Sequence, residues 1–125
     1  NGKIHLLGGY DGSSAVNTHY IYDGTSWTSN GRLLYNVASS SAVVLNNSIH
    51  LIGGYSGTTS SRTVSSTYCL YNDAVGWTSK GNLPSSYCDG TAVVFNKKIY
   101  IIGGSDSSGE LKTFYVATPL YSVNK

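Results

Sequence analysis

The stretch Ile49-His50-Leu51-Ile52-Gly53-Gly54 decides the fold of this chain, because the same pattern occurs three times. Apolar runs that end in two glycines also occupy residues 4–9 and 99–104, so the unit recurs after 45 and then after 50 residues. When residues 27–54 are laid on residues 77–104 without a gap, 13 of 28 positions are identical. A period of this length indicates a protein built from structural repeats.

Each repeat is predicted to contain four short strands and no helix. In the middle repeat we expect strands at 42–45, 49–53, 67–72 and 77–79, where β-branched and aromatic residues gather between turns rich in Gly, Asn, Ser and Asp. No stretch places apolar residues at helical spacing over three turns. Four-stranded units at this period are typical of propeller blades, which bury their faces only against neighbouring blades.

Two further motifs follow each glycine pair. Tyr22-Asp23 precedes Trp27, and Tyr71-Asn72 precedes Trp77. With the apolar run and the glycines, this arrangement resembles the Kelch repeat. Its amino-acid sequence is most similar to Kelch-like repeats of bacterial surface proteins and tailed phages. The resemblance covers residues 1 to about 104 and thins afterwards, where no Trp is present and Tyr121 could replace it. It implies an all-β fold made of Kelch blades.

The chain is expected to be a fragment of a β-propeller. Its units span about 1–41, 42–90 and 91–125, which gives about two and a half to three four-stranded blades because the first unit lacks an inner strand. A propeller closes with about four to eight blades. The remaining blades are therefore expected from the same chain or from a partner chain. In the blades present, 42–45 and 91–95 are predicted to be inner strands, with both Trp on outer strands.

Composition and charge exclude two kinds of partner. Charged residues make up 11% of the chain, and the net charge of +2 is spread without a basic block, so nucleic acid is not expected as a partner. No apolar run approaches the roughly 18 residues of a membrane span, so none is predicted. The resemblance to surface and phage repeats favours an extracellular or virion location.

Residues fixed by the repeat are predicted to serve packing. The glycine pairs are not followed by the motif or the helix of a phosphate-binding loop, so they are expected to allow close backbone packing. The two Trp occupy the same position in each repeat, which favours packing between blades; the alternative is that they stack on sugars. The predicted structural residues are Gly8, Gly9, Gly53, Gly54, Gly103, Gly104, Trp27 and Trp77.

The histidines and cysteines, which could bind a metal or act in catalysis, are not predicted to form an active site. His5 and His50 share a repeat position with Tyr100, which favours aromatic packing, and a metal site would need three or four converging ligands. Cys69 and Cys88 are expected to be free buried thiols; the alternatives are a disulfide or, by resemblance to Kelch-type copper-radical oxidases, a cross-linked Cys and Tyr site. No catalytic residue, metal or cofactor is therefore predicted.

The long loops are the predicted binding surface, because function is often placed on loops that a rigid scaffold supports. They span 10–18, 30–41, 55–66, 80–90 and 105–111, and alternate with short turns at the other strand ends. Tyrosine gives a large contact area at low entropic cost, and polar neighbours add hydrogen bonds. The candidate binding residues are Tyr10, Asp11, Tyr35, Tyr55, Arg62, Tyr87, Asp89 and Asp106.

The sequence thus predicts a non-catalytic module that binds a protein or a surface glycan through its long loops. The alternative is a part of a sugar enzyme, since the resemblance extends to Kelch-like sugar oxidases and sialic acid mutarotases. Such an enzyme would need convergent His, Arg, Glu or Cys residues, whereas the chain has a single Glu, Glu110, and scattered histidines.

Overall fold

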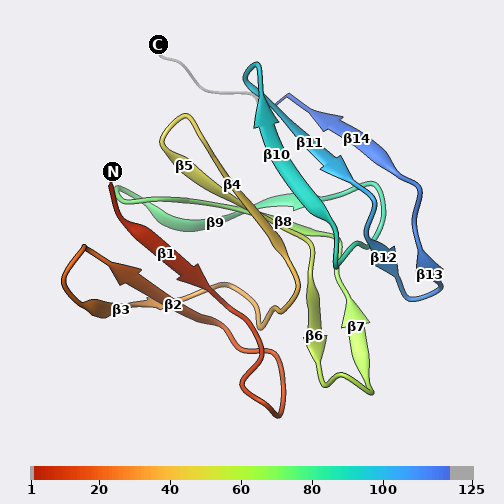
Figure 1. The fold of residues 1–125 in the computed structure, drawn as a ribbon, viewed down its shortest axis with the longest axis horizontal. Helices are drawn as coiled ribbons and strands as arrows, with labels where there is room; N and C mark the ends of the chain where they lie inside the picture. The colour runs from red at the N-terminus through yellow and green to blue at the C-terminus, as the bar shows by residue number, and fades with distance from the viewer. Residues whose placement is uncertain (1, 119–125) are drawn as a thin grey trace.

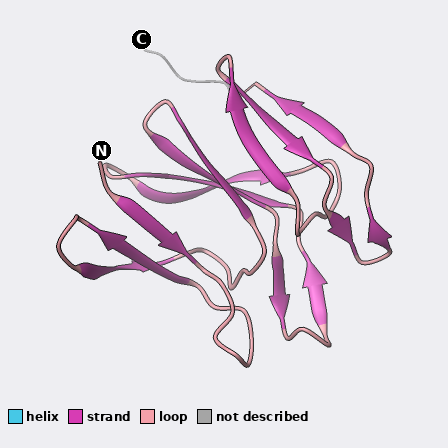
Figure 2. Ribbon diagram, in the orientation of Figure 1, coloured by secondary structure: helices cyan, strands magenta, loops and turns pink. Residues whose placement is uncertain are grey.

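The computed structural model describes residues 2–118, and this part of the chain consists only of strands and loops (Figure 2). Three antiparallel sheets follow one another along the chain, and two short hairpins project from them (Figure 1). The predicted all-β class is therefore confirmed.

The second sheet has four strands, in the order of the chain from the inner to the outer edge. Cross-strand pairs such as Leu51 with Cys69 set its register. The outer strand continues beyond the predicted 77–79, because residues up to Asn82 still pair with the neighbouring strand. The strands of this sheet are β4 (Ser41–Leu45), β5 (Ser48–Ile52), β8 (Thr67–Asn72) and β9 (Gly76–Asn82).

The first and third sheets each have three described strands. The first sheet has the order β1-β2-β3, so within residues 2–118 it has no equivalent of inner strand β4, and the third has the order β10-β11-β14. Tyr121, which could replace the third Trp, lies outside the described residues. The strands are β1 (Ile4–Leu7), β2 (Thr18–Tyr22), β3 (Trp27–Arg32), β10 (Thr91–Phe95), β11 (Lys98–Ile102) and β14 (Phe114–Ala117).

The arrangement of inner and outer strands matches the prediction. Strands β4 and β10 are the inner strands of their sheets and lie next to each other. Trp27 is the first residue of β3 and Trp77 is the second residue of β9, and these are the outermost strands of their sheets. The three sheets therefore fan out from the inner strands as blades do (Figure 1).

The core lies between the sheets, because each strand sends alternate side chains to opposite faces. On β5, Leu51 points toward the first sheet and packs with Leu33 and Cys69. The next residue, Ile52, points toward the third sheet and packs with Ile99 and Tyr87. One sheet thus contributes to two apolar layers and needs a neighbour on both sides.

A single ring fills the space that several glycines leave beside the third sheet. Tyr87 is 2% exposed, and a Cβ atom at Gly53, Gly90 or Gly104 would collide with it. The φ angle of 63° at Gly53 is itself unfavourable for other residues. The close approach lets the Gly54 amide donate a hydrogen bond of 2.7 Å to the Tyr87 carbonyl oxygen.

Two of the predicted long loops are β-hairpins. Residues 55–66 contain β6 (Tyr55–Gly57) and β7 (Arg62–Val64), and residues 105–111 contain β12 (Ser105–Asp106) and β13 (Gly109–Glu110). Both hairpins point the same way in Figure 1. We call this surface the hairpin face and include the turn at 10–15 and the connections 33–40 and 83–90. The opposite surface carries the tight turns at 23–26, 46–47, 73–75 and 96–97, and we call it the short-turn face.

Candidate binding surface

Backbone hydrogen bonds join neighbouring units along the hairpin face. Ala38 and Tyr55 form an antiparallel bridge, and Cys88 and Ser105 form the equivalent bridge one unit further on. The Ala15 amide also donates a 2.9 Å hydrogen bond to the Gly57 carbonyl oxygen. The hairpins are therefore held by the scaffold, which gives their side chains defined positions.

Three of the predicted binding residues meet at the hairpin of the second unit. The Arg62 guanidinium carbon lies 4.7 Å from the centre of the Tyr55 ring, in cation–π geometry. Arg62 also forms an ion pair with Asp89, with 3.5 Å between Nη1 and Oδ2. The side chains of Arg62 and Asp89 are 33% and 42% exposed, so they remain accessible from solvent. This cluster joins the second unit to the connection that leads into the third.

Further hydrogen bonds fix the Asp89 carboxylate. Oδ2 accepts from the Ser105 hydroxyl at 3.2 Å and from the Cys88 thiol at 3.4 Å. Burial raises the pKa of Asp89, but hydrogen bonds from Ser39, Cys88 and Ser105 and the charge of Arg62 outweigh it, so the pKa lies below its ordinary value. The carboxylate is therefore ionised at neutral pH.

Tyr10 and Asp11 form the turn that extends from the first unit. The Asp11 carboxylate accepts hydrogen bonds from the amides of Ser13 and Ser14, which lowers the pKa of Asp11. The Tyr10 hydroxyl donates to the Ser13 carbonyl oxygen at 2.9 Å and accepts from the Thr59 amide at 3.4 Å. Tyr10 is 37% exposed, so its ring is accessible where this turn meets the hairpin β6–β7.

The predicted tyrosines differ in accessibility. Tyr87 lies in the core, as described above, and Tyr55 is 5% exposed beneath Arg62. These two rings support the surface from below and are not available for direct contact, because the glycines and the interunit bridge draw the backbone close around them. Tyr35, in the connection 33–40, is 43% exposed.

Tyr35 borders a groove of about 340 Å³ between the first two units. Its walls are the connection 33–40 and the hairpin β6–β7 with the residues that follow it. The lining residues are Tyr35, Asn36, Val37, Ser56, Thr63, Val64, Ser65, Ser66 and Thr67.

Asp106 lies apart from the Arg62 cluster, in the hairpin of the third unit. Its carboxylate accepts a 2.7 Å hydrogen bond from the Ser108 amide, so it caps its own turn. The structure thus brings Tyr55, Arg62 and Asp89 together, places Tyr10 near the same hairpin, and leaves Asp106 separate.

A second group of polar residues, not predicted as a site, lies at the junction of the first two sheets. His19 is fully buried on β2, and its Nδ1 accepts hydrogen bonds from Trp77 at 3.1 Å and Asn30 at 3.4 Å. Because both partners donate, the proton of neutral His19 is on Nε2, which lies 2.9 Å from His5 Nδ1. Burial lowers the pKa of His19 to about 4, and the His5 charge adds to this effect.

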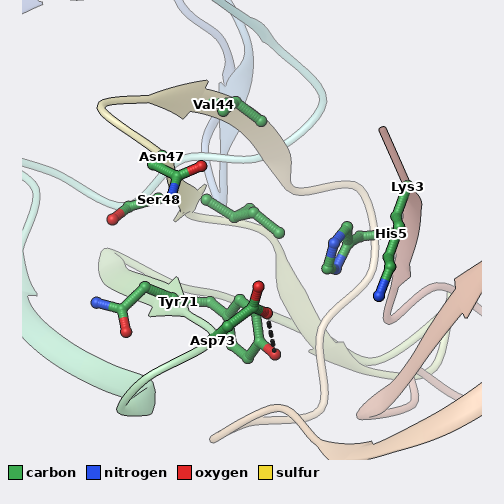
Figure 3. A pocket seen from close by; sticks show the side chains of 9 residues that line it. Lys3, His5, Val44, Asn47, Ser48, Tyr71 and Asp73 are labelled. Carbon is green, nitrogen blue, oxygen red and sulfur yellow. Dashed lines mark hydrogen bonds between the residues drawn. The ribbon is translucent and has the colours of Figure 1, made fainter. Parts of the chain in front are cut away.

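A small pocket of about 80 Å³ opens beside His5 on the short-turn face (Figure 3). Lys3 and Asp73 lie on opposite sides of it, and the Tyr71 hydroxyl donates to the Asp73 carboxylate at 3.2 Å. The only sequence signal for this group was the repeat position that His5 shares with His50 and Tyr100. That signal could not reveal His19, because the equivalent residue of the second unit is Tyr68.

Residues 2–118 contain no group of three or more His, Cys, Asp or Glu side chains arranged to hold a metal ion. Cys69 and Cys88 are both free and buried, and burial raises the pKa of each thiol. The described chain contains no helix with the length and apolar character that crossing a membrane requires.

Comparisons with known proteins agree with this fold. Residues 86–116 match the family model described as the Kelch motif. A search of curated proteins finds no match. Among solved structures, the one titled "Structure of YjhT" is similar with a TM-score of 0.83 and 19% sequence identity, over 95% of this chain and 40% of that chain. The present chain therefore spans about 40% of the length of that protein, and at this identity the likeness concerns the fold.

The motif match and the fold lead to the same result for this chain. The family model covers the third unit, and the structural similarity extends over all three. The predicted resemblance to the Kelch repeat is confirmed at residues 86–116, and the described chain has the fold of part of a β-propeller.

Proposed function

We propose that this chain is part of a non-catalytic binding module whose hairpin face contacts a protein or a surface glycan. The main support is the Arg62 cluster, in which a guanidinium that is one-third exposed is held over Tyr55 and beside Asp89. Arginine and tyrosine contribute strongly to binding interfaces when they are held in place before the partner arrives. On the resemblance of its repeats, we extend the proposal to a place on a bacterial surface or in a phage particle.

The aspartates of the described chain support binding over catalysis. Asp11, Asp23 and Asp106 each accept hydrogen bonds from backbone amides of their own turns. Asp89 is paired with Arg62, and Asp73 accepts from Tyr71. General acid–base chemistry on a sugar needs carboxyl groups that converge on one bond. These aspartates instead shape turns and fix side chains on the surface.

The test compares partner binding by the full-length protein with and without Tyr10→Ala and Arg62→Ala combined. Pull-down and a glycan array cover the two partner classes. We expect binding to fall by at least about thirtyfold, equivalent to about 2 kcal/mol, if these residues are central anchors. Both side chains are accessible, so the free energy of unfolding should change by less than about 1 kcal/mol.

Lys98→Ala is the matched control, because Lys98 is exposed and follows the turn 96–97 on the short-turn face. This variant should bind as the unmodified protein does. Loss of binding in Lys98→Ala, with full binding in the double variant, would place the partner on the opposite face and contradict the proposal.

A further inference from the structure

We propose that the groove beside Tyr35 binds a neutral saccharide, an inference that rests on the proposed binding function and gives one of its ligands a chemical class. The groove has a volume of about 340 Å³, at the lower end of the range of small-molecule sites. It opens between two units that share backbone hydrogen bonds, so its two walls are held relative to each other.

The walls offer hydrogen-bonding groups that the protein itself does not use. Among residues 2–118, the side chains of Asn36, Ser56, Thr63 and Ser66 form no hydrogen bond. A side-chain amide has both donors and an acceptor, and each hydroxyl can act in either way. The hydroxyl groups of a sugar ring have the same double character. A saccharide can therefore form hydrogen bonds with this lining without requiring a charge.

Tyr35 supplies the apolar complement of these groups. Its ring is 43% exposed at the edge of the groove, and Val37 and Val64 also line it. The C–H groups on one face of a pyranose ring are apolar and pack on an aromatic side chain, while the tyrosine hydroxyl is available for a hydrogen bond. An exposed aromatic ring beside free hydroxyl and amide groups matches both faces of a sugar.

Charge determines which class of saccharide fits. All nine lining residues are uncharged, and the neighbouring Arg62 is paired with Asp89. A phosphate, a uronic acid or an acidic peptide would lose hydration in this groove without gaining a cationic partner. The observations therefore favour a neutral sugar.

The repeats show that packing does not require these residues. The equivalent place is the junction between the second and third units. There, Ser85 replaces Tyr35, Asp106 replaces Ser56, and Lys112 replaces Ser66. The backbone bridges are the same in both units, with Ala38 to Tyr55 matched by Cys88 to Ser105. The blade thus forms with either set of side chains, and the combination of Tyr35 with an uncharged lining is specific to the first junction.

The experiment measures binding of the full-length protein to immobilised neutral oligosaccharides of hexose and N-acetylhexosamine, with uronic acid oligosaccharides as the charged comparison. The variants are Tyr35→Ala, Tyr35→Phe and Asn36→Ala, and the control is Ser85→Ala at the equivalent position. We expect neutral oligosaccharides to bind, Tyr35→Ala to weaken binding at least tenfold, and Tyr35→Phe to retain most of it. Ser85→Ala should have no effect, and melting temperatures should agree within a few degrees.

The inference is overturned if no neutral oligosaccharide binds, if the acidic ones bind more tightly, or if Tyr35→Ala binds normally. The variant with Tyr10→Ala and Arg62→Ala separates this result from the proposed function. Partner binding that depends on Tyr10 and Arg62, without any saccharide binding, would leave the binding module intact and remove only the sugar groove.

Discussion

Tyr87 illustrates how one residue can determine the spacing of two units. Its ring lies where side chains at Gly53, Gly90 and Gly104 would otherwise be, and its carbonyl oxygen accepts from Gly54. A position that tolerates only glycine in one unit can therefore be open in another. Gly103 occupies the same repeat position as Gly53, yet a Cβ atom there would meet no atom within 4 Å.

Gly53→Ala should destabilise the protein by about 3 kcal/mol or more, and Gly103→Ala by about 1 kcal/mol. Both residues have positive φ, at 63° and 66°, so the backbone strain is shared and only the collision with Tyr87 differs. Urea unfolding of the full-length protein measures both changes. Equal losses in the two variants would show that φ alone determines the cost.

Trp77→Ala should cost about 3 to 5 kcal/mol, and Trp27→Ala less than about 1 kcal/mol. Trp77 packs with the cluster that includes Leu33 and Leu51 and donates to His19, whereas Trp27 is 50% exposed and contacts Tyr22. Trp77 packs on the preceding unit, whereas within the described residues no unit precedes the first, so Trp27 lacks this contact. Thermal or urea unfolding of the two variants tests this difference, and a loss below about 1 kcal/mol in Trp77→Ala would show instead that Trp77 is only a surface platform.

The free energy of unfolding should fall as the pH is lowered from about 6.5 to about 4. His19 has a pKa of about 4 in the folded state and about 6.5 when unfolded, so between these values the unfolded chain binds more protons. Stability is therefore full above pH 6.5 and is lost as the pH falls through the folded pKa, by on the order of 2 kcal/mol.

Urea midpoints between pH 4 and pH 7 provide the measurement for this change. His19→Gln should flatten part of the slope, because Gln does not titrate. His5 and His50, whose pKa values burial also lowers, should maintain the remainder in the same direction. If His19→Gln has the same pH dependence of stability as the unmodified protein, protonation of His19 does not contribute to it.

The hairpins contribute to the fold as elements as well as carrying candidate residues. An antiparallel bridge joins the base of each hairpin to the connection from the preceding unit. The bridges pair Ala38 with Tyr55 and Cys88 with Ser105. The turn at 58–61, by comparison, is closed by long hydrogen bonds of 3.2 and 3.3 Å between Thr58 and Ser61. One hairpin therefore has a firmly held base and a loosely held tip.

Hydrogen exchange should separate base from tip. The amides of Ala38, Gly54 and Tyr55 are expected to exchange slowly, because they donate backbone hydrogen bonds of 2.7 to 2.9 Å at the base of the hairpin. The amide of Ser60, in the exposed turn, should exchange at least a hundredfold faster. Mass spectrometry of short peptides resolves the two regions, and uniform exchange along 53–66 would contradict a hairpin held at its base.

At the scale of the whole molecule, apolar side chains remain exposed at both outer sheets. Ile4 and Leu6 on β1 are 59% and 53% exposed, and Phe114 and Val116 on β14 are 62% and 49% exposed. In the second sheet, the positions equivalent to Ile4 and Leu6 are Ile49 and Leu51 on β5, and both are buried because that sheet has neighbours on both sides. The three units thus cover one another unequally.

The isolated 125-residue chain should therefore self-associate at micromolar concentrations. Exposed apolar strands with unpaired edges favour pairing between copies. Sedimentation at several concentrations measures this, and the double change Ile4→Thr and Leu6→Thr should reduce association. A strict monomer with one sharp, cooperative melting transition would contradict the expectation.

Much of this architecture was predictable, because its cause is repeated in the sequence. The glycine pairs and apolar runs located the strands and their order, and the inner strands 42–45 and 91–95 were correctly placed. The hairpins β6–β7 and β12–β13 were predicted as loops, since strands of two or three residues leave no alternating pattern to detect. Their pairing depends on bridges to distant residues such as Ala38.

The candidate surface was predictable only in part. Arg62 and Asp89 are 27 residues apart, and no local pattern indicates that they pair. Tyr55 and Tyr87 were grouped with exposed tyrosines because they lie in loop segments, but the glycines around Tyr87 allow its ring to enter the core. Burial at such a position depends on the neighbouring unit, which the sequence of a single repeat does not describe.

The distribution of backbone hydrogen bonds between the first two units has a mechanical consequence. In the described chain, Ala15 to Gly57 and Ala38 to Tyr55 join these units on the hairpin face, whereas side chains such as Trp77 and His19 connect them toward the short-turn face. The connection between the two units is therefore stiffer on the hairpin face than on the short-turn face. We therefore expect relative motion of these two units to hinge at the hairpin face and to widen the small pocket beside His5.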